Sequence, residues 1–198
     1  MPRNIVKLFK AKKFPTADSL VSAIKSDLET YSHFDDSGNN ILHYMARSGY
    51  EYVIQNILMP YKNPDFINKL NNEGLTPISI AVLHDKPTTA ILLIDSFDAD
   101  IFERGRFAHS AAYYMLQNKR MKPFIMKKLL KDDDAVQRYY EELVSFGNEE
   151  EIDAFFRSFK PDDRIRIDHL TTDTLDSEGI DSEAGLIGLS QASPADDD

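Results

Sequence analysis

The chain has 198 residues, of which 42% are hydrophobic and 28% are charged, and it contains neither Cys nor Trp. This composition is typical of a globular protein that is long enough to bury a core. The absence of Cys excludes disulfides, thiolate metal ligands and a Cys nucleophile. Because the sequence has no run of about 18 apolar residues, we expect no membrane-spanning helix.

The net charge of −10 is distributed unevenly along the chain. Residues 1–130 carry 17 Lys or Arg and 13 Asp or Glu, whereas residues 131–198 carry 6 and 20. Contacts to phosphate need a cationic face, so this balance argues against nucleic-acid binding by the whole chain. The acidic end is compatible with folding back onto the body and with a separate recognition role.

The N-terminal region predicts a helical cap. Its first 15 residues, MPRNIVKLFKAKKFP, are basic but lack a continuous apolar core and a cleavage site, so we expect no signal peptide. Residues 4–13 and 18–31 carry apolar side chains at helical spacing. We therefore expect capping helices within residues 1–31.

Residues 35–58 predict a helix, a turn and a second helix. Asn40 is a suitable N-cap, and Gly49 suits the left-handed conformation that ends many helices. The side chains expected to face inward are Ile41, Leu42, Met45 and Ala46 from the first helix, and Val53, Ile54, Ile57 and Leu58 from the second.

The stretch EGLTPISIAVLHDK, residues 73–86, begins a second unit of the same kind. Thr76 is the predicted N-cap, and Pro77 takes the first helical position, where its missing N–H costs nothing. Asp85 and Lys86 break this helix, and Pro87 begins the next one. The side chains expected to face inward are Ile78, Ala81, Val82, Ala90, Ile91 and Ile94.

Residues 103–130 predict a third and more degenerate unit, with a break near Asn118. Gly38, Gly74 and Gly105 begin the three units at separations of 36 and 31 residues, which indicates a stack of repeated helical pairs. The side chains expected to face inward in the third unit are Phe107, Ala108, Ala111, Ala112, Met115, Phe124, Ile125 and Leu129.

Between about residues 30 and 130 the three units resemble the ankyrin repeat, a unit of about 33 residues with the core D-x-x-G-x-T-P-L-H-x-A-A-x-x-G-H. The first unit matches this core at Asp35, Gly38, Leu42, His43, Ala46 and Gly49 and departs from it at Asn40, Ile41 and Met45. The second matches at Gly74, Thr76, Pro77 and Ala81, and it has Asn71, Ile78, Ser79 and Asp85 at motif positions. The third keeps Gly105, Ala111 and Ala112.

The resemblance implies an all-α ankyrin-repeat solenoid with short hairpin fingers over residues 32–130. The implied repeats are residues 35–67, 68–100 and 101–130. In this family the motif His is structural, and its ring hydrogen-bonds loop backbone between repeats. The resemblance therefore implies a structural role for His43 instead of a catalytic one.

Residues 131–160 predict a further helical pair that lacks the repeat motif. The acidic runs 132–134 and 149–151 are placed to favour helix N-termini, and Asn148 has capping-box spacing. Residues 161–198 are acidic and poor in aromatic residues, so we expect a largely disordered tail. The side chains expected to face inward in the pair are Val136, Tyr139, Tyr140, Leu143, Val144, Ile152, Phe155, Phe156 and Phe159.

The sequence contains no recognisable catalytic or metal-binding pattern. Its five His residues form no H-E-x-x-H motif, and no G-x-S-x-G, phosphate-binding or dinucleotide-binding loop occurs. Adjacent carboxylates in turns do not provide the fixed separation that a glycosidase needs. We therefore expect no catalytic residue, cofactor or metal ion.

The ankyrin resemblance implies a non-catalytic scaffold that binds another protein through its fingertips and the exposed side of its inner helices. Tyr and Arg are enriched at interface hot spots. The basic cluster at residues 118–128 is either a solvated helix face or a docking patch for an acidic partner or for the chain's own tail. The candidate partner-binding residues are Asn72, Glu73, Arg104 and Arg106 at the fingertips, and Tyr44, Arg47, Ile80, Leu83, His84, Tyr114 and Gln117 on the helices, with Tyr113 as the alternative to Tyr114.

Three biological settings are compatible with the sequence. A few-repeat ankyrin protein with an acidic C-terminal region resembles effectors that intracellular bacteria export by type IV secretion to act on a host protein. It also resembles a regulatory ankyrin protein of the NF-kappaB-inhibitor type. The third is an enzyme subunit with its site in residues 131–198. We expect a cytoplasmic monomer that binds no nucleic acid, either in the producing cell or after secretion into a host cell.

Overall fold

The computed structural model describes Thr16, Asp18 and residues 21–22, 35–58, 63–146, 149–160, 162–164 and 167. These residues form helices and contain no strand, so the described part of the chain is all-α, as the sequence predicts. The chain divides into two compact units, residues 1–129 and residues 130–198. The capping helices predicted within residues 1–31, apart from four described positions, lie outside this part of the chain.

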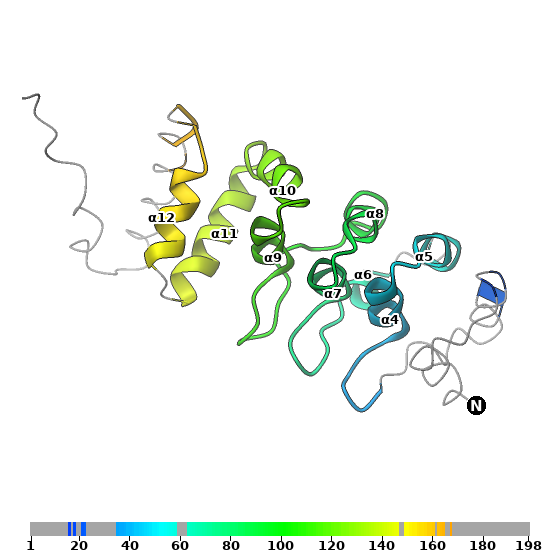
Figure 1. Ribbon diagram of the computed structural model, residues 1–198. Coiled ribbons are helices and arrows are strands. Elements are labelled where there is room, and N and C mark those ends of the chain that lie inside the picture. The colour runs from blue at the N-terminus through cyan, green and yellow to red at the C-terminus, as the bar shows by residue number, and fades with distance from the viewer. Residues whose placement is uncertain are drawn as a thin grey trace, which may run out of the picture. The chain divides into compact units, whose positions relative to one another are not determined.

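The first unit contains successive helical pairs joined by tight turns (Figure 1). α7 packs against both α4 and α9, and α5 packs against α8, so the first helices of the pairs form one layer and the second helices another. The loops that precede α4, α7 and α9 project side by side from one edge of these layers (Figure 1). The elements are α4 (Ile41–Ser48), α5 (Glu51–Leu58), α6 (Pro64–Ile67), α7 (Pro77–Leu83), α8 (Pro87–Phe97), α9 (Ala111–Gln117) and α10 (Lys122–Leu129).

Each first helix of a pair begins at a polar cap. Asn40 accepts the His43 N–H at the start of α4, and Thr76 accepts the Ser79 N–H at the start of α7, as predicted. These bonds satisfy amide groups that the helix itself leaves without partners. Ser110 caps α9 in the same way by accepting an amide from the first turn. This third cap was not predicted, because the degenerate repeat carries no recognisable start.

The core of the first unit consists largely of the side chains that the helical spacing predicts. Burying each large apolar side chain contributes roughly 1.5–3 kcal/mol to folding. Ile67 from α6 and Met121 after α9 also lie in this core, although the sequence analysis placed neither there. The predicted inward residues that are buried are Ile41, Leu42, Met45, Ala46, Val53, Ile54, Ile78, Ala81, Val82, Ala90, Ile94, Ala108, Ala111, Ala112, Met115, Ile125 and Leu129.

The prediction that Phe107 belongs to the core is wrong. This side chain was expected to face inward, but 87% of its surface is exposed. The reason is that α9 begins only at Ala111, so Phe107 lies in the preceding loop and not on a helical face. Ile91 and Phe124, also expected inside, are half-buried.

Hydrogen bonds join the loops that precede the first helices. The Asn72 N–H donates to the Ser37 carbonyl at 3.0 Å, and the Gly105 N–H donates to the Gly74 carbonyl at 2.9 Å. Gly74 has φ +74°, and a Cβ at this position would lie 2.8 Å from the Gly105 Cα. Only glycine permits this close approach without displacing backbone. Two of the three glycines that suggested the repeat period are therefore in direct contact.

The second unit contains α11 (Asp133–Phe146) and α12 (Glu149–Arg157), which pack on each other. Asp132 accepts the Ala135 N–H at 3.2 Å, so its acidic run begins α11 as predicted. The Phe155 ring lies 5.0 Å from that of Tyr139 and 4.9 Å from that of Phe159, measured between centroids. The other predicted core residues are buried at Val136, Tyr140 and Leu143 and half-buried at Val144, Ile152 and Phe156.

The predicted tail begins at residue 161, and most of it lies outside the described residues. Residues 162–164 form a helical turn. The Arg164 Nε donates to the Phe156 carbonyl at 2.9 Å, which ties this turn to α12. The helix break predicted at residues 147–148 is likewise outside the described part.

Candidate functional site

A surface hollow of about 340 Å³ lies where α4 and α7 meet the loops that precede them. We call it the α4–α7 hollow. Because its lining comes from two neighbouring helical pairs, it exists only when these pairs are packed together. It brings together six of the predicted partner-binding residues, which are Tyr44, Arg47, Glu73, Ile80, Leu83 and His84, beside Asp35, Ser37, Asn39, His43, Asn71 and Leu75.

His43 forms the buried base of the α4–α7 hollow, with 1% of its surface exposed. Its Nδ1 accepts the Asn40 N–H at 3.1 Å, and its Nε2–H donates to the Leu75 carbonyl at 3.2 Å. Burial lowers the pKa of His43 to about 4, although hydrogen bonds to the backbone of Leu75 and Lys69 and the charge of Asp35 act in the opposite direction. The ring is therefore neutral and joins the two pairs, which confirms the structural role predicted for it.

Asp35 and Tyr44 form the loop side of the hollow. Asp35 Oδ1 accepts the Ser37 N–H at 3.0 Å and the Asn39 N–H at 2.9 Å, and Oδ2 accepts the Tyr44 hydroxyl. Burial raises the pKa of Asp35, but these hydrogen bonds outweigh it, so the pKa is lowered. Burial and the Asp35 carboxylate both raise the pKa of Tyr44, which keeps its proton. Tyr44, predicted as a partner contact, therefore also holds the loop against α4.

Two basic side chains, Arg47 and His84, lie at the opposite end of the hollow, where α4 and α7 end. Arg47 lies in the last turn of α4, and His84 follows the last residue of α7. Burial lowers the pKa of His84, and the positive charges of Arg47 and Lys86 lower it further. The Arg47 guanidinium has no hydrogen bond or ion pair within the described residues. It is thus available to an incoming anionic group.

The apolar part of the hollow comes from α7. Ile78, Ala81 and Val82 face the core, which leaves Ile80 and Leu83 on the other face of the helix. Ile80 is half-buried, whereas Leu83 is 48% exposed. Leu83 and Arg47 thus present an apolar and a cationic side chain to the same hollow.

Asn72 and Arg104 have structural roles that the sequence did not reveal. The Asn72 side-chain amide donates to the Asp36 carbonyl at 3.0 Å, so it braces two loops and does not line the hollow. Arg104 is half-buried, and its Nη1 donates to the Ala108 carbonyl at 3.5 Å within its own loop. Both hydrogen bonds depend on how the loops fold and pack. A sequence motif does not specify that packing.

The remaining candidates lie on the third helical pair, away from the α4–α7 hollow. Arg106 is exposed and lies 5.3 Å above the Phe107 ring, an aromatic contact that the sequence analysis missed. His109 stacks on Tyr113 at 3.7 Å, and Tyr114 meets the Tyr113 ring edge-on at 5.7 Å. Gln117 is exposed at the end of α9. Helical spacing assigned Phe107 to the core, and its position before the Ser110 cap is the signal that could have indicated a loop.

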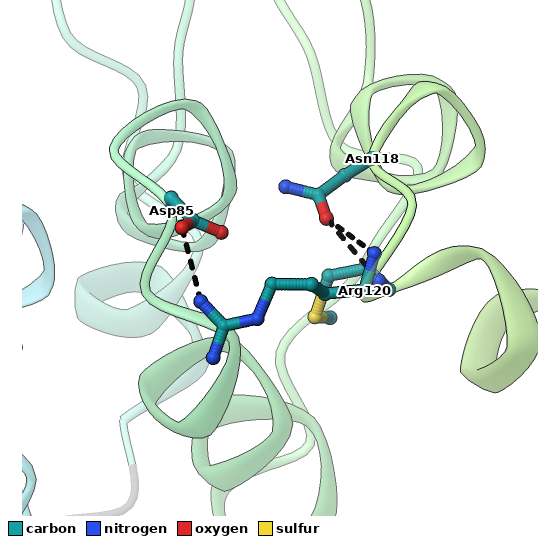
Figure 2. Close-up of polar contacts among 4 residues, drawn as sticks. Asp85, Asn118 and Arg120 are labelled. Atoms are coloured by element: carbon teal, nitrogen blue, oxygen red, sulfur yellow. Dashed lines mark hydrogen bonds and ion pairs between the residues drawn. The ribbon is translucent and has the colours of Figure 1, made fainter.

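The basic cluster at residues 118–128 contributes an ion pair between neighbouring turns. Figure 2 shows Arg120 reaching from the turn after α9 to Asp85 in the turn after α7, at 3.0 Å. Asn118 Oδ1 accepts the Arg120 N–H at 2.9 Å and fixes this turn. Both charged side chains are more than half exposed, so the pair contributes at most about 1 kcal/mol.

Comparisons with known proteins assign no family to this chain. No protein-family model matches it, and no curated protein is significantly similar to it. Within the described residues, no group of three His, Asp or Glu side chains could hold a metal ion. In the same part of the chain, no helix has the length and apolar character needed to cross a membrane.

Proposed function

We propose that this chain is a non-catalytic scaffold of the ankyrin-repeat type that binds another protein across the α4–α7 hollow. One observation carries the proposal, namely that six of the predicted partner-binding residues line this one hollow. These six residues are among the fingertip and exposed inner-helix positions at which the ankyrin resemblance implies partner contacts.

The backbone arrangement of the first unit supports the ankyrin part of the proposal. An ankyrin repeat needs a capped inner helix, a loop that stacks on its neighbours and a motif His that joins adjacent repeats. Thr76 caps α7, the Asn72 and Gly105 amides link successive loops, and His43 reaches the Leu75 carbonyl. These contacts span about one repeat length in the sequence, as stacked repeats require.

The chemistry of the hollow supports a protein partner. Covering Leu83 would remove apolar surface from water, which stabilises a complex by roughly 25 cal/mol per Å². Arg47 offers a cation that has no partner in the described residues. The settings of an exported effector, an NF-kappaB-inhibitor-like regulator and an enzyme subunit stay predictions.

Replacing Leu83 with Arg tests the proposed function. The substitution places a charge in the middle of the proposed contact, so we expect at least a tenfold loss of partner protein captured from lysate, measured by quantitative mass spectrometry. Leu83 is exposed, and the thermal unfolding midpoint should therefore stay within a few degrees of wild type.

Gln55→Arg is the matched control, because Gln55 is exposed on α5 and does not line the hollow. This variant should capture the same proteins as the wild type. A partner that both variants retain at wild-type levels would show that the hollow is not the binding face.

A further inference from the structure

We infer that the α4–α7 hollow binds a partner segment in which an acidic side chain lies close to an apolar one, the acidic group at Arg47 and the apolar group at Leu83. This inference rests on the proposed function and adds the chemical character of the partner. It follows from how charge is distributed and neutralised around the hollow.

The carboxylates around the hollow leave Arg47 without a partner. Asp35 lies at the loop end, where it already accepts three hydrogen bonds. Asp85 follows His84 at the other end, but its carboxylate pairs with Arg120 (Figure 2). Glu73 also lines the hollow, and Glu51 lies near Lys86, but neither carboxylate forms an ion pair with Arg47. Among the described residues, the Arg47 guanidinium therefore has no carboxylate bound to it.

A second cation lies near Arg47. Burial lowers the pKa of His84, and the positive charges of Arg47 and Lys86 lower it further, so His84 is mainly neutral and lies within electrostatic reach of both cations. An incoming carboxylate would be attracted by both cations and would form a charge-assisted hydrogen bond with the Arg47 guanidinium. The cationic end thus selects for an acidic group.

The apolar and cationic groups are close enough to be met by one short segment. Leu83, Ile80 and Arg47 line the same hollow of about 340 Å³, which corresponds to on the order of ten water molecules. A ligand that fills this volume must present its apolar and acidic groups within a few residues of each other. The hollow therefore recognises a short partner segment in which an acidic and an apolar residue lie close together in the sequence.

The polar backbone of the hollow argues against a phosphate or nucleic-acid ligand. Phosphate sites usually present several free backbone N–H groups. Here Asp35 accepts the Ser37 and Asn39 amides, and Asn71 accepts the Glu73 and Leu75 amides. The loop end also carries the Glu73 carboxylate, which repels a polyanion. A peptide carboxylate needs only the cationic end, so it fits this lining better.

Selection from a random-peptide display library on the full-length protein tests this inference. We expect wild type to enrich peptides that carry Asp or Glu within four residues of Leu, Ile, Met or Phe. Arg47→Glu should instead enrich Lys or Arg at the acidic position, because it reverses the charge that the peptide meets. Leu83→Arg should abolish enrichment of the apolar residue.

The synthesised consensus peptide then gives the affinity by fluorescence anisotropy. Arg47→Glu should weaken its binding at least tenfold, and exchanging the peptide's acidic residue for Lys should restore binding to this variant. Gln55→Arg should bind like wild type. Circular dichroism and the unfolding midpoint confirm that each variant is folded.

Several outcomes would overturn the inference. They are the same consensus from wild type and Arg47→Glu, a basic or purely apolar consensus from wild type, and no enrichment above the Leu83→Arg background. Tight binding of a synthetic peptide of residues 176–189, which also mixes acidic and apolar residues, would assign the hollow to this chain itself. A captured protein that is lost with Leu83→Arg but kept with Arg47→Glu would contradict the inference and leave the proposed function standing.

Discussion

At the scale of single residues, His43 shows how one side chain can join two helical pairs. Its two ring nitrogens bond the Asn40 amide, at the start of its own helix, and the Leu75 carbonyl, 32 residues further along the chain. Only a neutral ring with its proton on Nε2 can form both bonds at once, because Nδ1 must accept while Nε2–H donates. The sequence resemblance predicted the second bond, whereas the first appears only in the structure.

This arrangement predicts a pH dependence of stability. The pKa of His43 is about 4 in the folded chain, against 6.5 for an unperturbed His, because burial disfavours the charged ring. Above pH 6.5 both states are neutral at this position. As the pH falls from 6.5 towards 4, only the unfolded state gains the proton, so the free energy of unfolding decreases, by about 3 kcal/mol in total.

Urea unfolding of wild type and His43→Gln between pH 4 and 8 measures this effect. The other titrating groups are common to both proteins. The difference between their free energies of unfolding should therefore narrow as the pH falls from 6.5 towards 4. Protonated Nδ1 would no longer accept the Asn40 amide but would donate to Asn40 Oδ1, 2.7 Å away, so burial of the charged ring is the main cost. A difference that stays constant across this range would show that His43 does not titrate as predicted.

At the scale of elements, helix starts were predicted better than loops. Thr76 and Asn40 cap their helices as expected because a cap is a local hydrogen bond within one turn. Phe107 was misplaced because periodicity alone cannot show where a degenerate helix begins. The contacts between neighbouring loops, such as that of Gly74 with Gly105, depend on stacking and were not predicted.

The contact between these loops predicts that Gly74→Ala is more destabilising than Gly49→Ala. Both glycines have φ near +75°, so both substitutions introduce the same left-handed strain of about 1–2 kcal/mol. At Gly74 the new Cβ would also meet the Gly105 backbone at 2.8 Å, whereas at Gly49 it meets the flexible Lys86 side chain at 3.1 Å. Separating the two loops would weaken the Gly105-to-Gly74 hydrogen bond.

We therefore expect Gly74→Ala to lower the free energy of unfolding by at least about 1 kcal/mol more than Gly49→Ala does. Denaturant unfolding of both variants under identical conditions measures this difference. If both variants lose the same free energy of unfolding, the contact between the two loops does not stabilise the fold.

At the scale of the whole molecule, the chain contains two compact units, and each includes buried apolar side chains. Leu42 belongs to the core of the first unit and Leu143 to that of the second. The acidic excess of residues 131–198 lies in the second unit, whereas the α4–α7 hollow belongs to the first. The proposed recognition chemistry is thus a property of one unit.

The division into two compact units predicts that a core substitution opens its own unit first. Leu42→Ala should cost roughly 2–5 kcal/mol and accelerate amide hydrogen exchange in α4 and α7, while α11 and α12 keep their protection. Leu143→Ala is the reciprocal variant and should accelerate exchange in α11 and α12. Mass-spectrometric exchange resolves the two sets of peptides. Equal acceleration across the whole chain in either variant would contradict separate opening.

The sequence by itself determined the all-α class, the starts of α4 and α7 and most of the buried side chains. These features depend on apolar spacing and on bonds within one helical turn. The tertiary structure alone decided which candidates share a surface, because that depends on how neighbouring pairs stack. The bond of Tyr44 to Asp35 forms between α4 and its own loop. Stacking of neighbouring pairs commits Asn72 to the Asp36 carbonyl and brings Arg47 and Leu83 to one hollow, where Arg47 has no hydrogen bond or ion pair in the described residues.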